Sequence, residues 1–175
     1  VLEGTEGERA IDIRTLRDET GLTTLDYGFK NTASCQSSIT YLDGEHGILR
    51  YRGYPVEELA AKSRFVEVAY LLVHGKLPDR GERDRFSALL TRHSMLHEDM
   101  TQFFKNYPEH AHPMAILSAM VVSLSTFYPE LARERLHEEE ELDVTTTRLL
   151  SKLRTIAAFS YKKSIGEPFV YPRHD

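Results

Sequence analysis

Residues 37–55 read SSITYLDGEHGILRYRGYP, and this stretch decides how the front of the chain folds. Ile39 and Tyr41 alternate with Thr40 and Leu42, as side chains do on the two faces of a pleated strand. Asp43-Gly44 is a hairpin dipeptide, because glycine takes a positive φ without steric cost. Ile48 to Tyr51 then forms a return strand, and Pro55 suits the first turn of a helix. The stretch therefore predicts a β-hairpin followed at once by a helix.

Beyond Pro55 the apolar residues recur every three or four positions, which is typical of α-helices. The helix over 79–106 is expected to bend near Ser94, and the one over 113–127 is apolar nearly all round and should be buried on several sides. Ser63 and Asp143 are the expected N-caps of the second and last helices. The charged stretch 129–143 is expected to be a solvated loop. The expected helix ranges are 56–61, 64–74, 79–106, 113–127 and 144–163.

These elements predict a mainly α fold with a small amino-terminal β-hairpin. We divide the chain into a turn-rich segment with the hairpin, 1–54, and a helical part, 55–175. The chain starts at Val1 rather than Met and stops in loop-like residues, so we expect a fragment of a longer polypeptide.

The bulk composition is that of a globular protein large enough to bury a core. Apolar residues make up 41% of the 175. The net charge of −5 gives no electrostatic reason to expect a nucleic acid or an anionic membrane as partner. No apolar run approaches the length of a membrane-spanning helix. Cys35 is the single cysteine, which excludes an internal disulfide and suits a cytoplasmic location.

No motif in the sequence marks a catalytic centre. The GxSxG elbow and the glycine-rich phosphate loops are absent. His93 and His97 are four residues apart, as are metal ligands on a helix face, and His110 and His112 form a second pair. Neither pair has a third potential ligand at a sequence spacing typical of metal sites. We therefore expect hydrogen-bonded histidines rather than a metal site.

A cluster of cations is the strongest candidate for ligand binding. Arg92-His93 lies on one expected helix, whereas Arg148 and Lys152 project from one face of another. If the two helices approach each other, these groups converge in an otherwise acidic chain and would suit a phosphate-bearing ligand. The alternative is that they pair with the acidic run 138–141 or with solvent.

Five blocks of sequence, in order and in register, resemble citrate synthases, in particular the bacterial type that forms hexamers. The resemblance implies an almost entirely helical fold with a large and a small domain, and this chain would supply helices of the large domain. The blocks are SSITYLDGEHGILRYRGYPVEELA (37–60), FVEVAYLLVHGKLP (65–78), TRHSMLHED (91–99), HPMAILSAM (112–120) and RLLSKLRTIAAFSYKKSIGEPFVYPR (148–173).

The resemblance implies an enzyme of the tricarboxylic acid cycle that condenses acetyl-CoA with oxaloacetate to citrate and CoA, without a required cofactor. In the family two histidines and an aspartate do the acid–base work, and all lie downstream of the segment seen here. We therefore assign no catalytic residue and expect the chain to be inactive alone. The alternatives are a 2-methylcitrate synthase, which uses propionyl-CoA, and a free-standing regulatory or assembly module.

Many hexameric members bind NADH as an allosteric inhibitor, and the resemblance carries that site onto seven positions here. Ser94 replaces a threonine usual in the pattern, and the loop after Tyr128 is longer and more acidic. The helices that begin at His112 and Asp143 resemble those of the family's dimer interface, so a homodimer or hexamer is expected. Small residues there are Ala115, Ser118, Ala119, Ala157, Ala158 and Ser160. The seven NADH positions are Arg92, His93, Ser94, Met95, Tyr128, Arg148 and Lys152.

Overall fold

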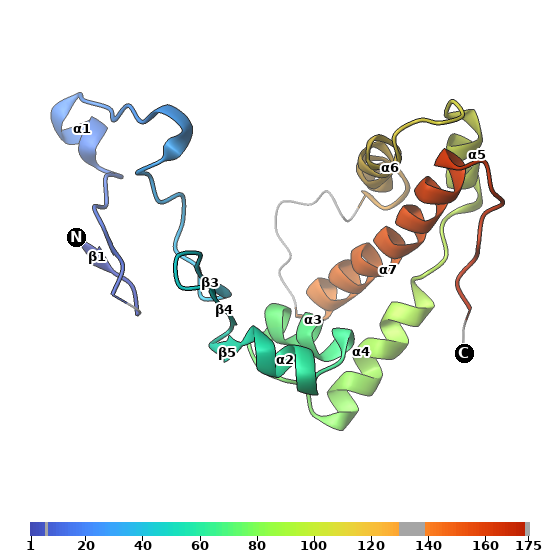
Figure 1. Ribbon diagram of the computed structural model, residues 1–175, viewed down its shortest axis with the longest axis horizontal. Helices are drawn as coiled ribbons and strands as arrows, with labels where there is room; N and C mark the ends of the chain where they lie inside the picture. Colours follow the sequence, from blue (N-terminus) through green and yellow to red (C-terminus); the bar gives the residue numbers. More distant parts are fainter. Residues whose placement is uncertain (6, 130–138, 174–175) are drawn as a thin grey trace. The chain divides into compact units, whose positions relative to one another are not determined.

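The computed structural model describes residues 1–5, 7–129 and 139–173, and it confirms a mainly helical fold with small antiparallel sheets (Figure 1). The chain divides into two compact units, Val1–Gly53 and Tyr54–Asp175. Of the expected loop 129–143, residues 130–138 lie outside the described residues, and residues 139–143 belong to a helix instead.

The first unit consists of short elements and buries none of its described residues. Strands β1 (Leu2–Glu3) and β2 (Arg9–Ala10) pair antiparallel, and α1 (Leu16–Thr20) and the 3-10 turn η1 (Tyr27–Phe29) follow. Strands β3 (Thr40–Asp43) and β4 (Ile48–Tyr51) form the predicted hairpin, with Thr40 opposite Tyr51 and Asp43 opposite Ile48.

The hairpin turn differs from the expected Asp43-Gly44 dipeptide. Four residues, 44–47, join the strands, and the positive φ of 68° lies at Gly47 rather than at Gly44. The Asp43 carboxylate accepts the amides of Glu45 and His46, each at 3.0 Å. Aspartate therefore shapes the turn through its side chain, as in an Asx-turn.

The second unit holds the helices that form the core. After β5 (Tyr54–Pro55), the chain forms the helices α2 (Val56–Lys62), α3 (Phe65–His74), α4 (Arg80–Arg92), α5 (Glu98–Asn106), α6 (Pro113–Phe127) and α7 (Glu139–Ser164). Helix α6 lies across α7, and α5 lies beside the far end of α7 (Figure 1). The buried apolar side chains that these three helices share are Met100, Phe104, Ile116, Met120, Leu124, Ile156 and Phe159.

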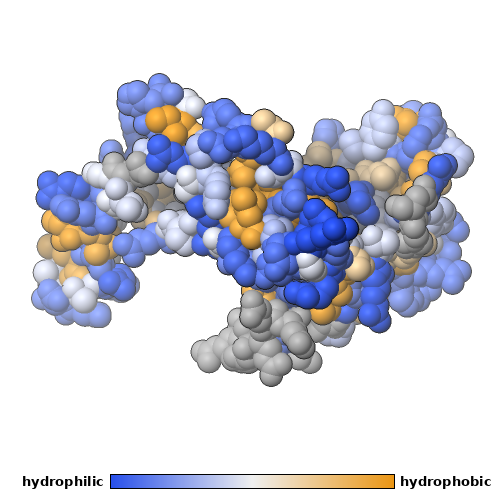
Figure 2. Space-filling model, turned by 90° about the horizontal axis from the view of Figure 1, so that it is seen from below, coloured by the Kyte–Doolittle hydropathy of each residue, from blue (hydrophilic) through white to orange (hydrophobic). Residues whose placement is uncertain are grey.

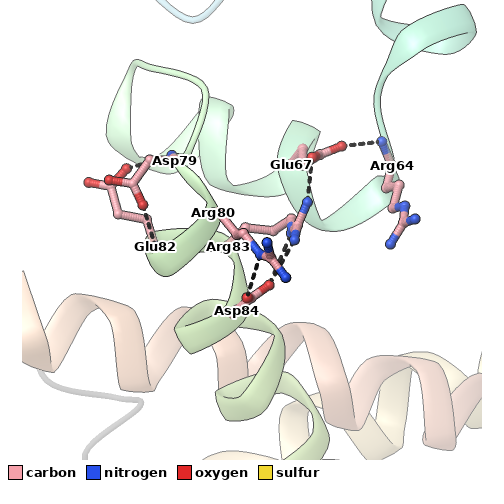
Figure 3. A network of polar contacts seen from close by, with 7 residues as sticks. All are labelled: Arg64, Glu67, Asp79, Arg80, Glu82, Arg83 and Asp84. Carbon is pink, nitrogen blue, oxygen red and sulfur yellow. Dashed lines mark hydrogen bonds and ion pairs between the residues drawn. The ribbon is translucent and has the colours of Figure 1, made fainter.

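Local capping explains where α3 and α4 begin. Glu67 accepts the amide of Arg64 at 2.7 Å, so Arg64 precedes α3, and the expected cap Ser63 instead closes α2. Asp79 and Glu82 bond each other's amides at 2.8 and 2.9 Å, a capping box at the start of α4 (Figure 3). Arg83 lies between the carboxylates of Asp84 and Glu67 and so joins α4 to α3.

Two further expectations are wrong. Asp143 does not cap the last helix, because α7 begins at Glu139 and Asp143 lies within it, 2.8 Å from the His74 ring. Helix α6 is buried along one stripe only, since Val122 is 71% exposed and Met114 is 60% exposed. Apolar residues, coloured orange in Figure 2, interrupt the otherwise hydrophilic surface.

The expected helix 79–106 is divided in two. Residues 93–97 leave the helical path between α4 and α5, near the Ser94 position where a bend was expected. His97 begins the second helix, because its Nδ1 accepts the Asp99 amide at 3.2 Å. This interruption places backbone carbonyls of 94 and 95 where another helix can reach them.

Candidate functional site

The end of α4 is held against α7 by three side chains of α7. The Ser151 hydroxyl donates to the Leu90 carbonyl at 2.7 Å, and the Thr155 hydroxyl donates to the Ser94 carbonyl at 2.7 Å. The Lys152 ammonium donates to the Met95 carbonyl at 2.5 Å. A helix leaves its last carbonyls without partners inside the helix, and Ser151 satisfies one of these at Leu90. Lys152 and Thr155 instead bond carbonyls of the segment that follows α4. We call Ser151, Lys152 and Thr155 the α7 contact residues.

This packing brings together the four groups of the cationic cluster, defined as Arg92, His93, Arg148 and Lys152. Arg92 is the last residue of α4, and His93 is its C-cap. The ring of Tyr128, which follows α6, completes the site. Its centroid lies 5.1 Å from the Arg148 guanidinium carbon and 4.6 Å from the Lys152 ammonium, both within cation–π range.

The positive charge of the cluster affects the pKa of His93. Burial lowers the pKa of the His93 ring, and the charges of Arg148, Lys152 and Arg92 lower it further. A neutral imidazole is therefore favoured beside three permanent cations. An anion bound among these groups would reverse the last three effects and favour the protonated ring.

Lys152 is the most unusual member of the cluster because it is only 3% exposed. Among the residues that the structure describes, no carboxylate forms an ion pair with its ammonium group. The charge lies at the carboxyl end of α4, where the helix dipole is negative and favours a cation. Lys152 therefore has a structural role at the end of α4, where it donates to the Met95 carbonyl.

Two further expected site residues have different surroundings. Ser94 is 1% exposed and follows α4, and its hydroxyl donates to the carbonyl of Thr91 in the last turn of α4 at 2.8 Å. Met95 is 42% exposed, and its carbonyl accepts the hydrogen bond from the Lys152 ammonium. Sequence reasoning missed Ser151 and Thr155. Their only signal is position, because small hydroxyl residues four apart share a helix face beside Lys152.

In the structure, His93, His97 and His112 each lie at the end of a helix. His93 and His97 no longer share a helix, and His97 and His112 each accept a helix amide through Nδ1. Within residues 1–5, 7–129 and 139–173, no group of three or more potential metal ligands comes together. No helix in the same ranges has the length and apolarity needed to cross a membrane.

Comparison with known proteins identifies a family that this chain resembles over most of its length. Residues 28–175 match the family model described as "Citrate synthase, C-terminal domain". Citrate synthase 1 of Mycobacterium tuberculosis is 49% identical over 172 residues, which is 98% of this chain and 39% of that protein. The chain thus spans about two fifths of the length of the curated relatives it matches.

Solved structures agree with this result. The citrate synthase of Pyrobaculum aerophilum is 31% identical with a TM-score of 0.74, covering 95% of this chain and 43% of that one. The Thermotoga maritima enzyme is 33% identical with a TM-score of 0.68, covering 86% and 38%. The Thermoplasma acidophilum enzyme, at 19% identity, shows the same fold with a TM-score of 0.77 and covers 87% and 39%.

Proposed function

Because the chain belongs to the citrate synthase family, we propose that it forms part of an enzyme that condenses acetyl-CoA with oxaloacetate to give citrate and CoA. The observation that carries this proposal is the 49% identity to a citrate synthase over nearly the whole chain. We further propose that the acid–base residues lie outside these 175. The described part of the chain holds two close histidine–carboxylate pairs, His46–Asp43 at 2.7 Å and His74–Asp143 at 2.8 Å, and we propose that both are structural.

A thiol-release assay with acetyl-CoA and oxaloacetate tests both statements. The chain alone should release no CoA above background, and rapid turnover would show that catalysis resides here. A chimera in which this chain replaces the matching segment of the M. tuberculosis relative should release CoA only when both substrates are present. A folded chimera without activity would contradict the proposal that this chain is a citrate synthase segment.

We infer that the cationic cluster binds NADH as an allosteric inhibitor. Three observations support the inference: the convergence of Arg92, His93, Arg148 and Lys152, the Tyr128 ring beside two of the cations, and a buried ammonium without an ion-pair partner among the described residues. Arginine and lysine together suit the pyrophosphate of a dinucleotide. Since the Ser94 hydroxyl already donates to the Thr91 carbonyl of α4, we expect binding to be weak.

Isothermal calorimetry with NADH tests this site, and α7 provides a matched control. Arg148→Ala should abolish the binding heat, because it removes the cation on one side of Tyr128. Arg154→Ala removes the same charge from an exposed position of the same helix and should leave the affinity unchanged. Equal affinities in the two variants would remove the cationic cluster from the proposal.

We also propose that the chain assembles with a second copy through α6 and α7. Exposed apolar side chains on these helices support this, namely Met114, Val122, Leu149, Leu153 and Tyr161. Of the expected small interface residues, Ser160 is 1% exposed and is therefore buried within its own chain. Val122→Asp should reduce the mass measured by light scattering. An unchanged oligomer would exclude this face of α6.

A further inference from the structure

Helix α6 is capped by His112, whose side chain accepts a hydrogen bond from an amide in the first turn. The Met114 amide donates to Nδ1 of His112 at 3.2 Å. Pro113, the first residue of the helix, has no amide proton. The amides of Ala115 and Ile116 donate to the His112 carbonyl at 3.0 and 3.3 Å. Met114 is therefore the first-turn residue whose amide depends on the imidazole.

The bond requires a particular protonation state. Nδ1 accepts a hydrogen bond only when its lone pair is available, which places the ring proton on Nε2. Protonation turns the acceptor into a second donor that faces the amide of Met114. It also adds a positive charge at the positive end of the helix dipole. Protonation therefore removes the hydrogen bond and opposes the helix dipole at the same time.

Helix α5 offers a comparison within the same core, because His97 caps it in the same way at 3.2 Å. Here Asp99 Oδ2 lies 3.6 Å from Nδ1, and Glu98 and Asp99 occupy the first turn. The ring also lies against Phe127 of α6, with centroids 5.1 Å apart. A protonated His97 therefore keeps a carboxylate partner that can offset the lost bond.

His112 has no such compensation. The first turn of α6 contains no acidic residue, and the ionisable groups nearest in sequence are Glu109 and His110. Among the described residues of α5, α7 and the segment 107–111, no carboxylate forms an ion pair with the His112 ring. The charge of a protonated ring would thus face the helix end without a counter-ion from these elements.

We propose that His112 is a proton-sensitive cap that loosens the first turn of α6 as the pH falls, whereas the first turn of α5 remains in place. Ile116, whose amide donates to the His112 carbonyl, is fully buried in the core shared by α5, α6 and α7. Loosening of the turn therefore reaches the edge of that core. The cap makes this end of α6 a pH-responsive element of the fold.

Nuclear magnetic resonance of the 15N-labelled full chain tests the proposal. At pH 7.5 the His112 ring should show the tautomer with an unprotonated Nδ1. Amide exchange of Met114, divided by its intrinsic rate at each pH, should rise about tenfold between pH 7.5 and pH 5.5. Exchange of Asp99 should rise by less than about threefold, because its cap keeps a carboxylate.

Substitution separates proton sensing from helix capping. His112→Asn keeps an acceptor at all pH values, so exchange of Met114 should become independent of pH. His112→Ser serves the same purpose if the asparagine variant does not fold. A proton on Nδ1 at pH 7.5 would overturn the proposal. Equal Met114 exchange at both pH values in the unmodified chain, or a pH dependence retained in both variants, would do so as well.

Discussion

Removing the Ser151 hydroxyl should destabilise the protein far more than removing that of Ser160. Both serines lie in α7, are 2% and 1% exposed, and donate to a carbonyl at 2.7 Å. Their acceptors differ. Ser160 bonds the Ile156 carbonyl, which the regular helical bond already satisfies. Ser151 bonds the Leu90 carbonyl, whose helical donor would be the Ser94 amide, but that amide bonds Thr91 instead, at 3.2 Å.

The difference in acceptors sets the magnitude. Ser151→Ala leaves a buried carbonyl without a partner, which costs about 1–3 kcal/mol in free energy of unfolding. Ser160→Ala removes a second bond from a satisfied carbonyl, and alanine favours a helix by a few tenths of a kcal/mol. The Ser160 variant should therefore lie within about 0.5 kcal/mol of the unmodified protein.

Urea unfolding followed by circular dichroism measures both variants against the unmodified chain. Ser151→Ala should lower the midpoint and leave the slope unchanged, as expected for a loss of stability without a change in exposed surface. If the two variants differ by less than about 0.5 kcal/mol, the bond to α4 contributes no more than an ordinary accessory bond. The account of how α7 holds the end of α4 would then be wrong.

Three other predictions concern the core, a cap and the cationic cluster. Phe104→Ala should lower the free energy of unfolding by about 3–5 kcal/mol, whereas Phe103→Ala, at a residue that is 48% exposed, should cost much less in the same urea titration. Asp79→Ala should cost about 1 kcal/mol by loss of its bond to the Glu82 amide, and Asp79→Ser should recover most of it. Because the pKa of His93 is lowered in the folded state, the unfolded chain binds that proton more readily, and stability should fall as the pH drops through about 6.5. His93→Gln should reduce this fall in unfolding experiments between pH 7 and pH 5, and an unchanged pH profile would refute the assignment.

Local signals in the sequence predicted the elements whose causes are local. Pro113 after His112 marks the start of α6, and the Asp43-Gly44 dipeptide between two short runs that suit strands marks the hairpin. The spacing of Arg148 and Lys152 placed both on one face of α7, and the structure brings that face to Arg92 and His93.

The features that sequence reasoning missed depend on distant residues. No glycine or proline interrupts residues 93–97, so nothing local predicts a full break there. Its carbonyls are satisfied by Lys152 and Thr155, which follow 57 and 61 residues later. Likewise, the apolar composition of α6 could not reveal that Val122 remains 71% exposed, because burial depends on which faces other elements cover.

The contacts of α7 with the end of α4 also have a consequence for the thermodynamics of ligand binding. Ser151, Lys152 and Thr155 fix the backbone at the end of α4 and just after it through bonds within the chain, and these bonds hold the cations close together despite their mutual repulsion. A ligand phosphate would meet a preorganised array and lose little affinity to the ordering of loops or side chains. Its binding should therefore relieve electrostatic strain rather than induce a new arrangement of helices.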